Sequence, residues 1–301
     1  MKLSLNLKSL SLHNGLSIEE IADLVSNAGF DASDYSLGCM TKRENIFDAA
    51  DYLAVAENIG CELKRRNVPV TQTHAPYDFQ FKIPGEFESF IYPRIVRSIE
   101  ISAAMGAQIT VIHPLHHYVY KGHQEEIFQK NMAYYRSLIP IAKANGIKIA
   151  IENMWQKDRR RGYISHDTCS TIPEFIRYVD ELDSEQIVAC LDVGHVGLPP
   201  TDDEAWDFIY ALGHDRLQSL HIHDNDYKDD LHALPYAGKM DWARITEALG
   251  KIDYSGDFTY ELNMSLLEKV DAAFLPTALR YFADLGKHLV HMVDNNRPID
   301  A

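Results

Sequence analysis

The stretch IVACLDVGH, residues 187–195, begins with an apolar run of strand length that ends at Asp192, a residue with a metal-binding side chain. Three further runs end in the same way, in KIAIENM (148–154), LQSLHIHDND (217–226) and DFTYELN (257–263). If these strands are neighbours in a parallel barrel, their carboxyl ends meet at one face, where the active sites of such barrels collect. Three carboxylates and one imidazole would then share a divalent ion, with Mn or Mg expected and Zn or Co as alternatives. The expected metal ligands are Glu152, Asp192, His223 and Glu261.

Short β-like runs alternate with amphipathic stretches along the whole chain, a pattern typical of βα units around a parallel sheet. Eight such units predict an α/β protein with a single (β/α)8 TIM barrel domain over residues 1–301. A doubly wound open sheet is the alternative, but no GxGxxG follows the first strand. The expected strands are residues 2–7, 32–37, 70–74, 108–113, 148–153, 187–193, 217–223 and 257–262.

Capping residues and glycines predict where the helices begin and end. We expect helices to begin after Ser17, Glu86 and Thr171. We expect the C-terminal tail from about residue 287 to extend the last helix and then fray. Several helices should end near a glycine in a left-handed cap, namely at Gly29, Gly60, Gly106, Gly146 and Gly250.

Composition indicates an ordinary globular protein, with 46% hydrophobic and 24% charged residues. The sequence contains no apolar run long enough to cross a membrane. The N-terminus alternates apolar and polar residues and lacks the hydrophobic stretch of a secretory signal, so we expect a cytoplasmic location. Four cysteines without CxxC spacing indicate reduced thiols rather than a disulfide framework.

The formal charge of −15, from 29 basic and 44 acidic residues, disfavours a broad nucleic-acid surface. The same overall charge is still compatible with a small basic pocket. One concentrated basic run, KDRRR at 157–161, follows the strand that ends in Glu152. If the barrel forms, this run lies on a loop at the active face, either as a solvated loop or as a clamp for an anionic substrate group.

Alternation of side chains on the seventh strand places Ser219, His221 and His223 on one face. Both histidines then point into the barrel at different depths. His223, nearer the carboxyl end, is the expected ligand, and His221 is expected one layer lower. The three carboxylates end otherwise apolar strands, where an unpaired charge is costly to bury. One shared cation would satisfy all three.

The ordered motifs resemble those of the xylose isomerase-like TIM barrels, a superfamily that includes endonuclease IV and the sugar isomerases and epimerases related to D-tagatose 3-epimerase. Each motif is short, but their order and spacing cover nearly the whole chain. The motifs are HAPY from His74, VIHP around His113, IEN at Glu152, LDVGH ending at His195, HIHDND from His221, DLH from Asp230 to His232, GKMDW from Gly238 and YEL ending at Leu262.

The resemblance to the epimerase branch implies a metal at the four ligands above, a substrate contact at His195, and proton transfer by Glu152 and Glu261. One glutamate would remove a proton beside a carbonyl, forming a metal-stabilised enediolate. Return of the proton to a neighbouring carbon gives isomerisation, and return to the opposite face gives epimerisation. Further substrate contacts are predicted at His74, His113, Trp155 and Lys228. His116 and His117 are assigned either to the pocket or to a solvated loop.

Other functions stay open for the same site. A lyase or dehydratase acting on a keto-sugar or cyclic hydroxy acid would begin with the same proton loss, whereas a scaffold barrel would need no metal. The endonuclease IV branch would make the chain an abasic-site repair enzyme, although acidic loops such as TDDEAWD disfavour DNA. We expect a small sugar or sugar derivative as partner, without membrane or nucleic acid, and self-association stays open. The three-zinc site of that branch matches in type and order His74, His113, Glu152, Asp192, His195, His223, Asp230, His232 and Glu261, which makes Asp230 and His232 candidates for an additional metal.

Overall fold

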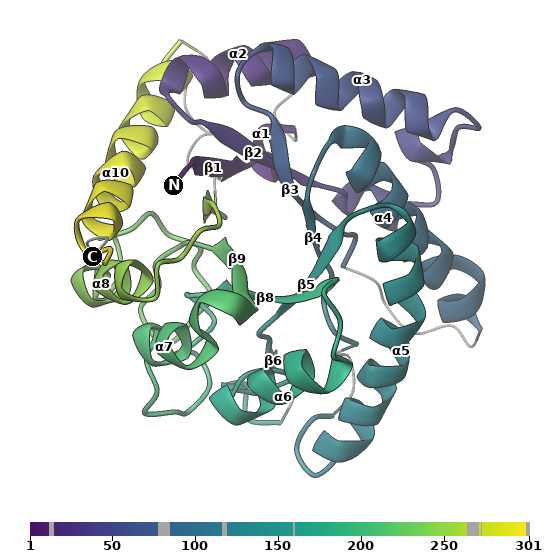
Figure 1. The fold of residues 1–301 in the computed structure, drawn as a ribbon. Helices are drawn as coiled ribbons and strands as arrows, with labels where there is room; N and C mark the ends of the chain where they lie inside the picture. The colour runs from purple at the N-terminus through teal and green to yellow at the C-terminus, as the bar shows by residue number, and fades with distance from the viewer. Residues whose placement is uncertain are drawn as a thin grey trace.

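Eight parallel strands close into a ring, which confirms the predicted (β/α)8 TIM barrel (Figure 1). The computed structural model describes residues 1–11, 15–77, 85–115, 119–158, 160–263, 271 and 273–298. His116 and His117, and Arg159 of the basic run, lie outside the described residues. The barrel strands are β1 Leu3–Asn6, β2 Ala32–Ser36, β3 Val70–His74, β4 Ile109–Val111, β5 Lys148–Glu152, β8 Ile187–Asp192, β9 Leu217–His221 and β10 Phe258–Tyr260.

The order of the strands around the ring follows the chain. Neighbours pair in the order β10, β1, β2, β3, β4, β5, β8 and β9, and a parallel bridge between Ile222 and Tyr260 joins the two ends. Each strand of the barrel lies within its expected range, because apolar runs between turn signals are long enough to identify these strands from local sequence.

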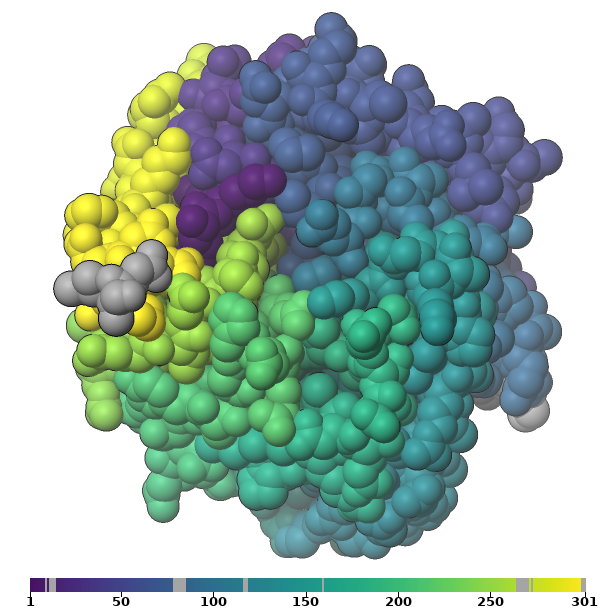
Figure 2. All heavy atoms as spheres, in the orientation of Figure 1, coloured from purple at the N-terminus to yellow at the C-terminus, as the bar shows by residue number. Residues whose placement is uncertain are grey.

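Helices surround the ring on its outside (Figure 1), and Figure 2 shows in the same orientation that side chains fill its middle. The barrel is thus a packed core rather than a pore. No helix within the described ranges is long and apolar enough to cross a bilayer. The α-helices are α1 Lys8–Ser11, α2 Ile18–Ala28, α3 Tyr52–Arg65, α4 Tyr92–Met105, α5 Gln124–Ala144, α6 Ile172–Leu182, α7 Ala205–Arg216, α8 Trp242–Lys251 and α10 Leu275–Asn295.

The predicted helix starts are found, with one difference. Ser17 caps α2 in a capping box, because its hydroxyl accepts from the Glu20 N–H at 3.2 Å while the Glu20 carboxylate accepts from the Ser17 N–H at 2.7 Å. Thr171 directly precedes α6. After Glu86, however, a π-helical turn over Phe87–Ile91 comes before α4, whose first turn contains a proline that has no N–H to donate.

Glycines near the helix ends have two different roles. Gly29 and Gly106 end α2 and α4 in the left-handed conformation, as predicted, with φ of 106° and 90°. Gly60 and Gly250 do not form the predicted caps, since both lie inside helices with ordinary φ, although α8 does end close to Gly250, at Lys251. A Cβ at Gly60 would lie 2.3 Å from the Met105 carbonyl oxygen, so this glycine lets α3 approach the end of α4.

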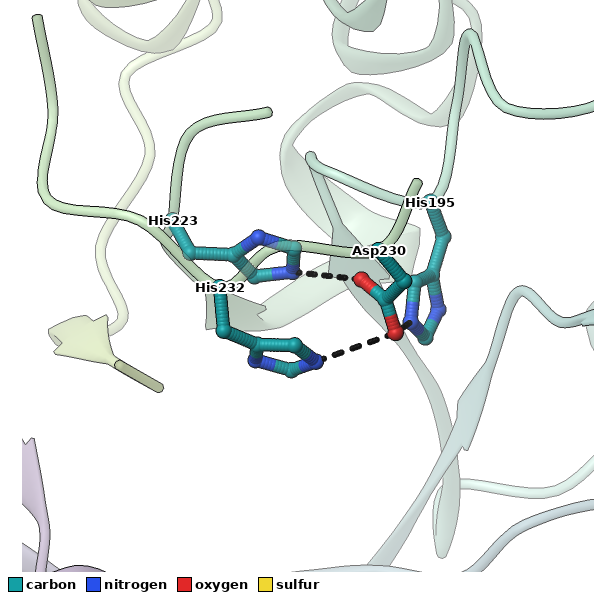
Figure 3. A group of neighbouring side chains, drawn as sticks. All are labelled: His195, His223, Asp230 and His232. Atoms are coloured by element: carbon teal, nitrogen blue, oxygen red, sulfur yellow. Dashed lines mark hydrogen bonds and ion pairs between the residues drawn. The ribbon is translucent and has the colours of Figure 1, made fainter. Parts of the chain in front are cut away.

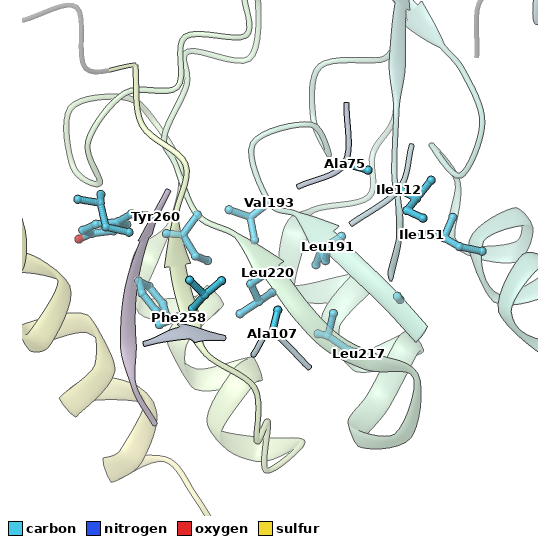
Figure 4. Close-up of a cluster of buried hydrophobic side chains, with 14 of the residues drawn as sticks. Ala75, Ala107, Ile112, Ile151, Leu191, Val193, Leu217, Leu220, Phe258 and Tyr260 are labelled. Atoms are coloured by element: carbon cyan, nitrogen blue, oxygen red, sulfur yellow. The ribbon is translucent and has the colours of Figure 1, made fainter. Parts of the chain in front are cut away.

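The strands separate two apolar clusters. The larger one lies between strands and helices and contains Leu191, Leu220 and Phe258 (Figure 4). A small one, of Val111, Ala150, Val188 and Cys190, lies inside the barrel, on the strand face that carries Glu152 and Asp192. The barrel interior therefore changes along its axis from small apolar side chains to charged ones at the carboxyl end.

A β-hairpin that the sequence did not predict follows β5. Its strands, β6 Trp155–Lys157 and β7 Ile164–His166, pair antiparallel, with Trp155 opposite His166. The Asp158 carboxylate accepts from the backbone N–H groups of Arg160 and Arg161 at 2.8 Å each, which closes the tip. At the other end of the chain, α10 continues through residues 287–295, as expected for the tail.

Candidate metal centre and substrate cavity

The four predicted ligands all lie at the carboxyl end of the barrel. Glu152 and Asp192 are the last residues of β5 and β8, Glu261 directly follows β10, and His223 lies two residues beyond β9. Glu152, Asp192 and His223 are at most 1% exposed. Residues that are 31 or more positions apart in sequence thus meet because the ring brings the strand ends together.

His221, rather than His223, shares one group with all three carboxylates. Ligand atoms of Glu152, Asp192, His221 and Glu261 all lie within 4.8 Å of one another. His221 Nδ1 lies 3.0 Å from Glu152 Oε1 and 3.3 Å from Glu261 Oε2. Strand alternation predicts His221 one layer below His223, and from this position its ring reaches both glutamates.

His223 belongs to a second group, with His195, Asp230 and His232 (Figure 3). Its Nε2 lies 2.9 Å from Asp192 Oδ1 and 3.8 Å from Asp230 Oδ1. The His232 ring stacks on the His223 ring at 3.9 Å between centroids, and its Nε2 lies 3.1 Å from Asp230 Oδ2. Asp192 therefore links this group to the first one.

A third group contains His74, His113 and Glu152. His113 Nε2 lies 2.8 Å and His74 Nε2 lies 3.5 Å from Glu152 Oε2. Tyr77 packs on both imidazoles, with ring centroids 4.5 Å from His74 and 4.8 Å from His113, and its hydroxyl contacts Lys8. Glu152 thus lies between two groups, as Asp192 does.

Backbone and amide contacts hold these side chains in place. Asn153 joins the ends of β5 and β8, since its Oδ1 accepts from the Asp192 N–H at 2.8 Å and its Nδ2 donates to the Asp192 carbonyl at 3.0 Å. A Cβ at Gly194 would lie 2.0 Å from the His223 ring, so only glycine leaves room for that imidazole. Both residues lie within sequence motifs, but their roles cannot be recognised from sequence because they depend on contacts between strands.

The GKMDW motif holds the loop that follows β9. The buried Asp224 accepts from Trp242 Nε1 at 2.9 Å and from the Met240 N–H at 3.1 Å. Gly238 packs against the same carboxylate, because a Cβ there would lie 2.3 Å from Asp224 Oδ1. Contacts of Asp224 with Gly238, Met240 and Trp242 therefore hold the segment that carries His223.

The buried acids and imidazoles shift one another's pKa values. Burial would raise the pKa of Glu152, but positive charge on His221 and His113 outweighs it and holds that pKa well below its usual range. Burial would lower the pKa of His232, yet its hydrogen bond to Asp230 raises that pKa to about 9. Glu152 therefore stays ionised although it is buried, which a carboxylate ligand requires.

A cavity of about 1640 Å³ opens at this end of the barrel. Glu152 and Glu261 both line it, as do the predicted contacts His74, His113, His195 and Trp155. The hairpin β6–β7 and the loop around residues 119–121 form an outer wall. Lys228, in contrast, is exposed and is not among the described residues that line the cavity, so the structure does not bring it together with the other predicted contacts.

These features define a class of protein: a (β/α)8 barrel with a buried cluster of carboxylates and imidazoles beneath a cavity at the carboxyl ends of its strands. The chain belongs to the xylose isomerase-like TIM barrel family, whose family model matches residues 22–276.

Comparison with known proteins agrees with this assignment. The chain is 26% identical over 165 residues to an uncharacterized protein of Methanocaldococcus jannaschii, a match that covers 54% of each chain. It is 33% identical over 99 residues to the D-psicose 3-epimerase of Enterocloster bolteae, covering 33% of this chain and 29% of that protein. The matches to the first curated relatives thus span about half of the relatives' own length.

Solved structures match over nearly the full chain. A D-tagatose 3-epimerase-like protein superimposes with a TM-score of 0.73 at 21% identity, covering 98% of this chain and 99% of that one. The IolI protein with a bound zinc atom gives a TM-score of 0.71 at 17% identity, covering 99% of this chain and 100% of that one. At these identities the comparison shows a shared fold.

Proposed function

We propose that this chain is a divalent-metal-dependent isomerase or epimerase that moves a proton beside the carbonyl group of a small sugar or sugar derivative. One observation carries the proposal: Glu152 and Glu261 lie in one group with the buried Asp192 and His221, and both glutamates also line the cavity. Relatives and structural neighbours that are named as sugar epimerases support the same reaction class.

The donor set fits a divalent cation. Buried carboxylate oxygens and one imidazole within mutual reach are suited to Mn or Mg, our first assignment, with Zn or Co as alternatives. Glu152, Asp192 and Glu261 would hold the ion. His221 and His223 are both in place to complete the set, because each contacts one of these carboxylates at 3.0 Å or less. The IolI structure, which shares this fold and is described as having a bound zinc atom, supports a metal-binding role.

Further ions are compatible with the two flanking groups. Asp230 and His232 would hold an additional metal together with His195 and His223, and the other group offers His74 and His113 beside Glu152. The greater share of imidazole in these groups favours Zn or Co there over Mg.

A bound divalent ion would chelate adjacent sugar oxygens and stabilise the charge of the enediolate. The chain supplies the proton transfer. Glu152 or Glu261 takes the proton, and either the same carboxylate returns it to a neighbouring carbon or the other returns it to the opposite face, which contributes roughly 10²–10⁴ in rate. His195 donates from Nδ1 to the Asn153 carbonyl at 2.8 Å, which fixes the ring that borders the cavity. Trp155 offers an aromatic face to the sugar.

An abasic-site endonuclease is the second candidate, and a specific observation favours it. All nine residues that match the three-zinc site lie at the carboxyl end of the barrel, in the three groups described above or in contact with them. The acidic composition, with 44 acidic against 29 basic residues, favours a small-molecule substrate instead.

Deuterium exchange tests the proposed reaction directly. The protein, loaded with Mn, is incubated in heavy water with a panel of ketoses and keto-sugar acids, and incorporation is followed by NMR. We expect exchange at one carbon beside the carbonyl, and loss of water from the product would instead identify a lyase. Absence of exchange on every sugar, together with nicking of an abasic duplex, would overturn the proposal in favour of the repair enzyme.

Metal titration provides an independent readout. After chelator treatment, the protein is titrated with Mn, Co and Zn by calorimetry. We expect at least one stoichiometric site, and Asp192→Asn should weaken it because this carboxylate links two of the groups. A scaffold barrel would show no stoichiometric site.

A further inference from the structure

The outer wall of the cavity carries basic side chains, in contrast to the acidic floor. Lys157 and Arg160 come from the hairpin β6–β7, and Lys121 comes from the loop before α5. The two segments are joined, because the Tyr120 N–H donates to Gln156 Oε1 at 3.4 Å. Three cations from two separate segments therefore border the same cavity.

These cations have no acidic partner in the part of the chain that the structure describes, where no carboxylate lies within ion-pairing distance of Lys121, Lys157 or Arg160. Neighbouring Arg161 differs, since its guanidinium pairs with Asp158 at 3.2 Å. Asp158 also accepts the Arg160 and Arg161 N–H groups, so the one carboxylate of the hairpin tip is already engaged. In a chain with 15 more acidic than basic residues, positive charge at a cavity wall that no described carboxylate pairs favours an anionic ligand.

The size of the cavity leaves room for such a group. Its volume of about 1640 Å³ exceeds the roughly 300–1,000 Å³ of ordinary small-molecule sites. A sugar bound at Glu152 and Glu261 would leave the space beside the hairpin unfilled. An anionic group would avoid the carboxylates of the floor and meet the cations of the wall. Three cations on one wall suit a single anion, whereas a nucleic-acid track needs many phosphate contacts.

We infer that Lys121, Lys157 and Arg160 form an anion subsite and that the substrate is a sugar carrying a terminal phosphate or carboxylate. This inference rests on the proposed function for the identity of the sugar, but the anion subsite itself does not. Phosphate and carboxylate share the chemistry that the cations recognise, because both accept charge-assisted hydrogen bonds from Lys and Arg.

Calorimetric binding to the metal-loaded protein tests the inference with three probes of matched skeleton: D-fructose, D-fructose 6-phosphate and D-fructuronate. We expect one of the anionic probes to bind at least about tenfold more tightly than D-fructose, with the advantage falling as salt increases. Preference for the phosphate or for the uronate identifies the source of the anion. Equal binding of all three would overturn the inference.

The double variant Lys157→Gln/Arg160→Gln should lower the ratio of anionic to neutral affinity about tenfold, since two charge-assisted contacts are lost. Lys143→Gln, at an exposed position on α5, is the matched control and should leave that ratio unchanged. An anion preference that survives in the double variant would also overturn the inference.

Deuterium exchange separates the two proposals. If anionic probes bind through Lys157 and Arg160 but no sugar exchanges deuterium, the proposed reaction fails and the anion subsite stands. If neutral sugars exchange and the anionic ones gain no affinity, the reaction stands and the subsite fails.

Discussion

The floor of the cavity and its hairpin wall are built in opposite ways. The floor consists of residues at the ends of barrel strands, such as Glu152 and Asp192, which are at most 1% exposed and contact several partners each. The wall consists of a hairpin outside the barrel, where Lys157 and Arg160 are exposed. A rigid floor suits the chemistry, and a wall built from a hairpin outside the barrel can change its charge without disturbing the barrel.

The difference teaches which substitutions should affect catalysis and which should affect the choice of substrate. Floor residues share partners, so that changing one disturbs its neighbours and the effects are not additive. Each basic residue of the wall would act on the ligand through its own charge. Two substitutions in the floor and one behind the outer wall test this difference.

Glu261→Gln should have the greatest effect, because it removes a proposed proton-transfer group from the floor. We expect deuterium exchange to fall by about 10²–10⁴ while the unfolding transition stays cooperative. Glu247→Gln, at an exposed position on α8, is the matched control and should keep full exchange. Full activity in Glu261→Gln would contradict the assignment.

Gly194→Ala should disturb the floor through packing alone. Its Cβ would lie 2.0 Å from His223 Cε1, so the imidazole must shift, at a cost of about 1–3 kcal/mol in the free energy of unfolding. Metal affinity should fall with it, measured by calorimetry beside a denaturant titration. In Gly38→Ala the new Cβ would meet only the Ser36 hydroxyl, at 3.4 Å, and this control should be nearly neutral. Unchanged metal affinity in Gly194→Ala would show that metal binding does not depend on the position of the His223 ring.

Glu174→Gln tests a carboxylate behind the outer wall, where burial rather than a cation dominates. Burial raises the pKa of Glu174 from its ordinary value of 4.5 to about 7, although Tyr120 donates to it at 2.7 Å and lowers that pKa in part. The folded state therefore binds this proton more tightly than the unfolded chain does. That contribution to stability is fully present below about pH 4.5 and is lost as pH rises through about 7.

Between pH 5 and 8, the wild type should thus lose on the order of 2 kcal/mol of unfolding free energy that the Gln variant keeps. Denaturant titrations at several pH values measure the difference. Glu185→Gln, an exposed carboxylate in the loop after α6, should follow the wild type at every pH. Parallel pH curves for Glu174→Gln and the wild type would contradict the raised pKa.

The barrel could be predicted because its signals are local. Each β-run is marked by its own apolar residues, and Ser17 and Thr171 mark helix starts within a few positions of the turn they cap. Gly60 and Gly250 show the limit of this reasoning. A glycine at a left-handed cap and a glycine at a helix contact look alike in sequence, because only the neighbouring helix tells them apart.

The hairpin escaped prediction for a similar reason. Its strands are three residues each, too short for a recognisable period, and the basic letters of KDRRR indicate a solvated loop as readily as a structured tip. Pairing of Trp155 with His166 and the Asp158 contacts make it a hairpin. Both are interactions across the turn.

The order of residues along the chain was sufficient to predict the positions of the barrel strands and the acids at their ends, and hence to expect a metal at one face of the barrel. These features can be predicted because alternation and apolar runs are properties of neighbouring residues. Only the folded barrel shows that His221 meets the two glutamates while His223 meets Asp192 and Asp230, and that cations without an acidic partner among the described residues border the cavity. The physical reason is geometric. Which carboxylate an imidazole contacts depends on the length of the side chain and on its depth inside the closed barrel. Those quantities exist only after residues far apart in sequence have been brought together.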